Sequence, residues 1–121
     1  MVRRTKPMDV DDGVLLKPMP ITPGQKVKIR YQGLLANSGS EEIYLHMGFG
    51  DSNKWQQVQD IEMSKGKDGT WEATIELLED ETPTLNMCFR DNAFNWDNNS
   101  GANWIYQIHN GRMVQRTLRE F

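Results

Sequence analysis

Alternating hydrophobic and polar positions recur along the chain and predict a series of short β-strands. Residues 26–31 alternate strictly and place Val27, Ile29 and Tyr31 on one face. A period of two over this length is typical of a half-buried strand. By the same criterion, further strands are expected at residues 42–47, 57–63, 71–77, 85–90 and 103–109.

This succession of strands predicts an all-β fold, an antiparallel β-sandwich with a single domain. Six or seven short strands follow one another at a spacing of about ten residues, with no helical period between them. Turn residues separate the strands, including the Asn-Ser-Gly-Ser run at 37–40 and the Asp-Gly pair at 68–69. We expect the sandwich to span residues 23–110. An N-terminal arm at 1–22 would carry one short strand at 14–16, and an arginine-bearing tail at 111–121 would form a short helix or an edge strand.

The same alternation separates the four tryptophans into two groups. Trp71 and Trp104 are in phase with the apolar residues of their strands, so we expect both in the core. Trp55 and Trp96 lie outside any clean alternation, and each therefore either caps the sandwich or faces a ligand. His46 points outward from its strand, where a lone histidine is usually solvated or hydrogen-bonded to a neighbour.

Two loops combine an aromatic residue with small polar neighbours. Residues 48–55 form a glycine-rich run that ends at Trp55, and residues 90–101 surround Trp96 with asparagines and aspartates. Phe94, in the second loop, either caps the end of the sandwich or flanks a ligand. The apolar face of a pyranose ring stacks on an indole, and amide and carboxylate groups can bond its hydroxyls. Both loops therefore favour a sugar ligand.

Composition excludes several classes of protein. The 121 residues suffice for one domain with its own core. A net charge of -3 argues against a nucleic-acid partner, and the apolar runs are far shorter than the roughly 20 residues that cross a membrane. One cysteine forms neither an internal disulfide nor a zinc knuckle, and no apolar signal segment follows the basic opening residues.

The residues also argue against catalysis and a resident metal or cofactor. Glycoside hydrolysis needs two carboxylates across a deep cleft, whereas Asp91 and Asp97 lie six positions apart in one loop of a small sandwich. Cys88 has no activating base near it in sequence. Asp91, Asn95, Asp97 and Asn99 are hard oxygen ligands of the kind that calcium takes, but their spacing does not match an EF-hand loop.

Three segments resemble those of starch-binding modules. Residues 43–48 with Trp55 are similar to a hydrophobic-x-His-x-Gly…Trp pattern, and residues 69–75 to a Gly-x-Trp-x-Ala-x-hydrophobic strand. Residues 85–91 followed by 96–99 resemble a Leu-Asn-x-x-Phe-x-Asp…Trp-Asp-Asn-Asn ending. Together, over about residues 24–109, they resemble carbohydrate-binding module family 25 and its relative, family 53.

The resemblance implies an immunoglobulin-like sandwich that binds α-1,4-linked glucose polymers such as starch, glycogen and maltooligosaccharides, without catalysis. It implies that His46, Trp55 and Trp96 form the sugar platform, and that Asn98 and Asn99 supply polar contacts to hydroxyls. It further implies that Asp97 holds the loop of Trp96.

Two biological roles stay open at this point. In the first, binding of α-glucan is itself the function of the module, and a glycan-active enzyme is a further partner. In the second, the module is an intracellular regulatory or scaffolding module that tethers a partner protein to glycogen. We expect a cytoplasmic location if the chain is full length, and an extracellular one if it is a fragment of a secreted amylase.

Overall fold

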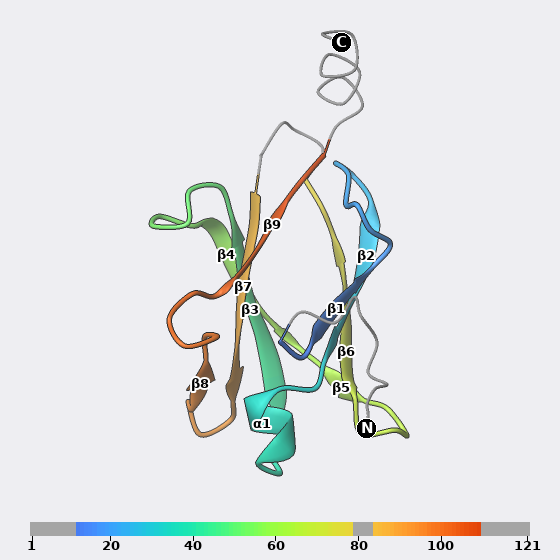
Figure 1. Cartoon of the computed structure of the whole chain (residues 1–121), viewed down its shortest axis with the longest axis vertical. Helices are drawn as coiled ribbons and strands as arrows, with labels where there is room; N and C mark the ends of the chain where they lie inside the picture. The colour runs from blue at the N-terminus through green and yellow to red at the C-terminus, as the bar shows by residue number, and fades with distance from the viewer. Residues whose placement is uncertain (1–11, 79–83, 110–121) are drawn as a thin grey trace, which may run out of the picture.

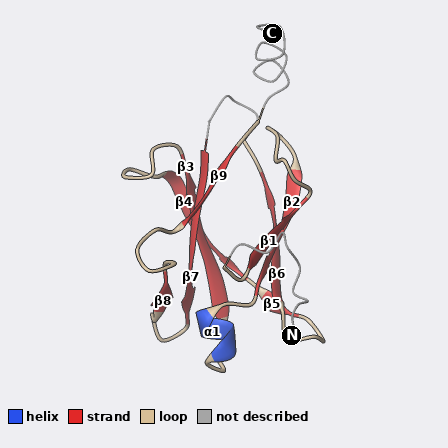
Figure 2. Ribbon diagram, in the orientation of Figure 1, coloured by secondary structure: helices blue, strands red, loops and turns tan. Residues whose placement is uncertain are grey.

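Two antiparallel β-sheets pack face to face in the computed structural model, which describes residues 12–78 and 84–109 (Figure 1). The first sheet has the order β1 (Val14–Lys17), β2 (Lys26–Tyr31), β6 (Trp71–Glu76), β5 (Ser64–Lys65). The second has the order β4 (Gln56–Glu62), β3 (Ile43–Phe49), β7 (Thr84–Asp91), β8 (Trp96–Asp97), and β9 (Trp104–Gln107) also pairs with β7. The predicted all-β sandwich is therefore confirmed (Figure 2).

The core lies between the sheets and consists of the side chains that alternation assigned to it. In β2, Val27, Ile29 and Tyr31 are fully buried, and the inward residues of β3 and β7 are buried against them. Trp71 is 5% exposed and Trp104 is 2% exposed. Both tryptophans that were predicted to be core residues are thus confirmed as such.

Three aromatic rings join the two sheets across the core. Tyr31 of the first sheet stacks on Phe89 of the second, with ring centroids 4.0 Å apart and planes 19° apart. Trp104 meets both rings edge-on, at 6.4 Å from Tyr31 and 5.3 Å from Phe89. Offset and edge-to-face pairs of this kind add stability beyond the apolar area that they bury.

The shortest elements were not expected from the sequence. A one-turn helix, α1 (Leu34–Asn37), precedes the turn at 37–40, and β5 and β8 have two residues each. Trp96, expected in a loop, is the first residue of β8 and pairs with Arg90 of β7. Elements of two to four residues are too short to display a period, which is why alternation did not reveal them.

The described part of the expected N-terminal arm packs on the sandwich. The predicted strand at 14–16 is confirmed as β1, which pairs with β2 along its whole length. Ile21 is fully buried and forms a parallel bridge with Ile108. Residues 1–11 and the tail at 111–121 lie outside the described residues. Within the described ranges, no helix is long and apolar enough to cross a membrane.

Replacing Trp71 tests the assignment of the core. Trp71→Ala should lower the free energy of unfolding by about 3–5 kcal/mol, as is typical when a buried large side chain is truncated. Urea denaturation followed by circular dichroism measures this difference. Met19→Ala, at an exposed apolar position, is the control and should change the stability little. An unchanged unfolding midpoint in Trp71→Ala would contradict the assignment.

Candidate ligand-binding site

His46, Trp55 and Trp96 lie together on the outer face of the five-stranded sheet. The imidazole centroid is 5.6 Å from that of Trp55, with planes inclined by 34°, and 5.1 Å from that of Trp96, with planes inclined by 83°. Because the two indole planes make such different angles with the imidazole plane, they are not parallel to one another. We call these three side chains the ring cluster.

Two loops project from the second sheet on one side of the molecule, and the first of them ends at Trp55. Figure 1 shows the β3–β4 loop (residues 50–55) and the β8–β9 loop (residues 98–103) extending from the second sheet, away from the first. His46 reaches the same face because it alternates with the buried Leu45 and Met47 of β3. Residues 46, 55 and 96 are thus brought together from three separate segments.

Trp55 lies against β3 because a glycine leaves room for it. A Cβ at Gly48 would come within 2.7 Å of the Cβ of Trp55 and 3.1 Å of its Cε3. The indole N–H donates to the carbonyl oxygen of Ser52 at 2.9 Å, within the same loop. The polar group of Trp55 is therefore already satisfied within its own loop.

Trp96 is held in place by the residue that follows it. Trp96 is 45% exposed, whereas Asp97 is buried. The Asp97 Oδ2 atom accepts hydrogen bonds from the Tyr31 hydroxyl at 2.6 Å and from the Leu34 N–H at 3.3 Å. The Oδ1 atom accepts from the Asn99 N–H at 3.2 Å. Asp97 thus anchors this segment to the aromatic core and to α1.

A chain of polar contacts orients the imidazole of the ring cluster. Nδ1 of His46 lies 2.5 Å from Oδ1 of Asp60, its partner across the β3–β4 ladder. Oδ2 of Asp60 accepts from Nε and Nη2 of Arg90 at 3.2 and 3.0 Å. Because an ionised carboxylate only accepts, Nδ1 carries the proton. Nε2 is the ring nitrogen that this contact leaves unused.

The ionised form of Asp60 is stabilised by these contacts. Partial burial raises the pKa of this carboxyl, but hydrogen bonds and charges from His46 and Arg90 outweigh it and hold the pKa below its ordinary value. The Arg90 guanidinium itself lies between two rings, 4.3 Å from the centroid of Tyr44 and 4.5 Å from that of Phe94. Its position is therefore fixed by both stacking and ion pairing.

Asn98 and Asn99 lie in the turn after β8. The Asn98 Oδ1 atom accepts from the Gly101 N–H at 3.0 Å, and the Asn99 Nδ2 group donates to the Asn103 carbonyl at 3.1 Å. Both residues line a surface hollow of about 410 Å³ together with Trp96. The structure therefore places them beside Trp96, with part of their hydrogen-bonding capacity used within their own turn.

The residues considered for catalysis have structural roles. The Asp91 carboxylate accepts from the Ala93 N–H, the Asn95 N–H and the Asn95 side-chain amide. These hydrogen bonds lower its pKa, whereas a general acid for glycoside hydrolysis needs a raised one. Cys88 is 6% exposed, and burial raises the pKa of its thiol to about 11. At neutral pH it is a thiol, which is a poor nucleophile.

Of the four residues considered as calcium ligands, the two aspartates already have hydrogen-bond partners in the chain. The carboxylates of Asp91 and Asp97 accept the hydrogen bonds described above, and these donors occupy the positions that a cation would take. Among the described residues, no three His, Cys, Asp or Glu side chains group closely enough to hold a metal ion.

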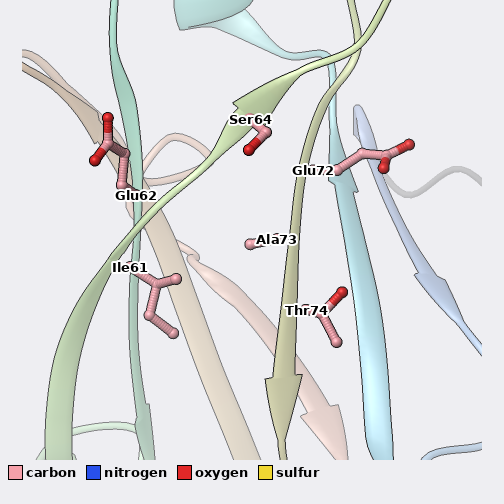
Figure 3. Close-up of a pocket in the computed structure, with 6 residues that line it drawn as sticks. All are labelled: Ile61, Glu62, Ser64, Glu72, Ala73 and Thr74. Atoms are coloured by element: carbon pink, nitrogen blue, oxygen red, sulfur yellow. The ribbon is translucent and has the colours of Figure 1, made fainter.

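A second hollow, of about 300 Å³, lies where the chain crosses from β4 to the first sheet (Figure 3). It contains no aromatic ring, and its lining residues are Ile61, Glu62, Ser64, Glu72, Ala73 and Thr74. Figure 3 shows the carboxylates of Glu62 and Glu72 pointing away from one another. The hollow therefore offers neither a stacking surface nor a pair of converging carboxylates.

Comparison with known families identifies the module. A model of the starch/carbohydrate-binding modules of family 53 matches residues 27–87, which is half of the chain. The chain belongs to family 53. The matched segment of this family 53 module includes His46 and Trp55, while Trp96 lies beyond it. Family 53 is the second of the two related families that the sequence resembles.

An enzyme contains a similar segment. The family 53 module is 40% identical over 84 residues to an α-amylase of Clostridium acetobutylicum, an alignment that covers 69% of this chain and 10% of the amylase. The module thus spans only about a tenth of the length of this relative. No solved structure is significantly similar to the chain.

Sequence reasoning missed the residues that support the ring cluster. Asp60 and Arg90 are far from His46 in sequence, and only the register of β4 and β7 against β3 brings them to it. Gly48 did carry a signal, since it stands two positions after His46, where a strand would ordinarily have an outward side chain.

Adding a methyl group at Gly48 should displace the indole of Trp55. In Gly48→Ala the new Cβ would lie far inside the ordinary carbon contact distance of about 3.5–4.0 Å, so the ring must move away from β3. We expect weaker retention on starch and a destabilisation of about 1–3 kcal/mol, as overpacking produces. Affinity electrophoresis and thermal unfolding measure the two effects.

Gly66→Ala is the control, in the turn between β5 and β6. A Cβ there would meet only two oxygens, both at 3.3 Å, so its neighbours need to shift by only a few tenths of an ångström, and retention on starch should stay as in the wild type. Unchanged retention of Gly48→Ala would show that the position of Trp55 against β3 does not matter for binding.

Acid should remove the stabilisation that Asp60 provides. The pKa of Asp60 is lower in the folded protein than its ordinary value of 3.8, so this stabilisation is present above that value and is lost as the pH falls through the folded pKa. The difference in unfolding free energy between wild type and Asp60→Asn should therefore shrink as the pH is lowered. Urea denaturation over this pH range measures it, and a difference independent of pH would exclude the ion pair.

Proposed function

We propose that this family 53 module binds α-1,4-linked glucan, without catalysis, by stacking glucose units on Trp55 and Trp96. The observation that carries the proposal is the convergence of the ring cluster on one face with its indole planes inclined. Inclined planes suit the curved chain of an α-1,4 glucan, whereas the flat chain of cellulose would suit coplanar rings. The character of family 53 as starch/carbohydrate-binding modules supports the same ligand class.

Stacking supplies most of the binding free energy in this proposal. If a sugar and an indole together remove about 100 Å² of apolar surface from water, the gain is about 2.5 kcal/mol per ring. Hydroxyl contacts to Nε2 of His46 and to the amides of Asn98 and Asn99 replace contacts with water, and each adds about 1 kcal/mol. Association itself costs several kcal/mol. The expected dissociation constant therefore lies between about 1 μM and 1 mM.

Weak single-site binding of this kind is sufficient on a polymer. A starch or glycogen particle presents many equivalent chains, and effective concentration raises the occupancy of a module that is attached to the same surface or enzyme. The similarity to an α-amylase supports a glycan-active enzyme as the partner. Assignment to family 25, tethering of a partner protein to glycogen and the cellular location all stay predictions.

Replacing either indole tests this proposal directly. Trp55→Ala and Trp96→Ala should each abolish retention in gels cast with starch or glycogen, because each removes one stacking surface. The midpoint of thermal unfolding should change little, since Trp96 is 45% exposed and Trp55 lies on the outer face of its sheet. Affinity electrophoresis with starch, glycogen, cellulose and xylan measures the ligand class as well.

Met19→Ala is the control for removal of an exposed apolar side chain elsewhere. Retention of both tryptophan variants on starch would contradict the proposal, as would wild-type retention by cellulose in preference to starch.

A further inference from the structure

Phe94 is a large aromatic residue that is mostly exposed, although its ring packs on the Arg90 guanidinium. It lies in the turn between β7 and β8, and it is 64% exposed. Its backbone has a φ of +63°, in the left-handed region that costs an ordinary L-residue about 1–2 kcal/mol. Strained positions of this kind cluster at functional sites, so this one calls for a functional explanation.

The turn holds its shape without help from the ring. The Phe94 N–H donates to the Asp91 carbonyl at 3.2 Å, and the Asp91 carboxylate accepts from the backbone N–H groups of Ala93 and Asn95. All of these bonds are made by the backbone or by Asp91. Glycine would adopt the same φ without strain, so the turn itself does not require a phenyl ring.

The ring packs on Arg90, the residue that links it to the ring cluster. Its centroid is 4.5 Å from the guanidinium carbon of Arg90. Arg90 is the cross-strand partner of Trp96, and through Asp60 it is linked to His46. Because the guanidinium lies over one face of the phenyl ring, the large exposed area belongs mainly to the other face. Phe94 and Trp96 are therefore both neighbours of Arg90, and both are exposed aromatic residues.

We propose that Phe94 forms an additional subsite, in which it stacks a further glucose unit of the same α-1,4 glucan chain that rests on Trp55 and Trp96. The inference rests on the proposed function and adds to it a dependence on ligand length. The Arg90 side chain, held between Tyr44 and Phe94, keeps the phenyl ring in position before the sugar arrives. Short oligosaccharides occupy the ring cluster alone, and longer ones also reach Phe94.

Calorimetric titration with linear maltooligosaccharides of increasing length tests this subsite. Phe94→Gly removes the ring and its packing on Arg90 but relieves the backbone strain, so the midpoint of thermal unfolding should change little. It should bind the shortest ligand as wild type does, and the longest ligand about tenfold more weakly, which corresponds to about 1.4 kcal/mol. Phe94→Tyr keeps an aromatic ring and should retain the affinity for long ligands.

Each other result overturns the subsite. Equal affinities of Phe94→Gly and wild type at every length would show that the ring touches no sugar. An equal weakening at every length would show that Phe94 acts through Arg90 on the ring cluster, and not as an additional subsite. Failure of the wild type to bind any maltooligosaccharide would overturn the proposed function itself, which distinguishes that failure from failure of the subsite alone.

Discussion

The buried hydrogen bond from the Tyr31 hydroxyl to the Asp97 carboxylate connects the core of this module to its candidate site. Burial, with the neighbouring carboxylate, raises the pKa of Tyr31, so the hydroxyl stays protonated and donates at every physiological pH. Gly33 leaves space for this contact, since a Cβ there would lie 2.7 Å from the tyrosine ring and 3.0 Å from Asp97 Oδ2. Trp96 can be largely exposed and still have a defined position because the next residue is bonded to the packed aromatic core.

The outer face is ordered by a second set of contacts that does not depend on burial. His46, Asp60 and Arg90 come from three adjacent strands, and their alignment follows from the register of β3 against β4 and β7. A ligand that meets this face finds the imidazole already oriented and the Trp55 indole already bonded to its own loop. Little side-chain entropy remains to be lost on binding, and preorganisation of this kind favours affinity at a shallow surface.

The fold was largely predictable from the sequence, and the candidate site only in part. Strict alternation identified Trp71 and Trp104 as core residues, and the absence of alternation singled out Trp55 and Trp96. The resemblance to starch-binding modules then named His46 beside them, and the structure brings these three together. Pairings such as residue 46 with residues 60 and 88 depend on strand register, which alternation alone does not determine. For the same reason the sequence left open whether Phe94 caps the sandwich or faces a ligand.

The most direct test of the glucan-binding account is a nuclear magnetic resonance titration that follows the four indole N–H signals as a maltooligosaccharide is added. The account predicts saturable shifts for Trp55 and Trp96, whose rings lie in the candidate site, with Trp71 and Trp104 unchanged because both are buried in the core. Binding of the oligosaccharide with no change in the signals of Trp55 and Trp96 would contradict it.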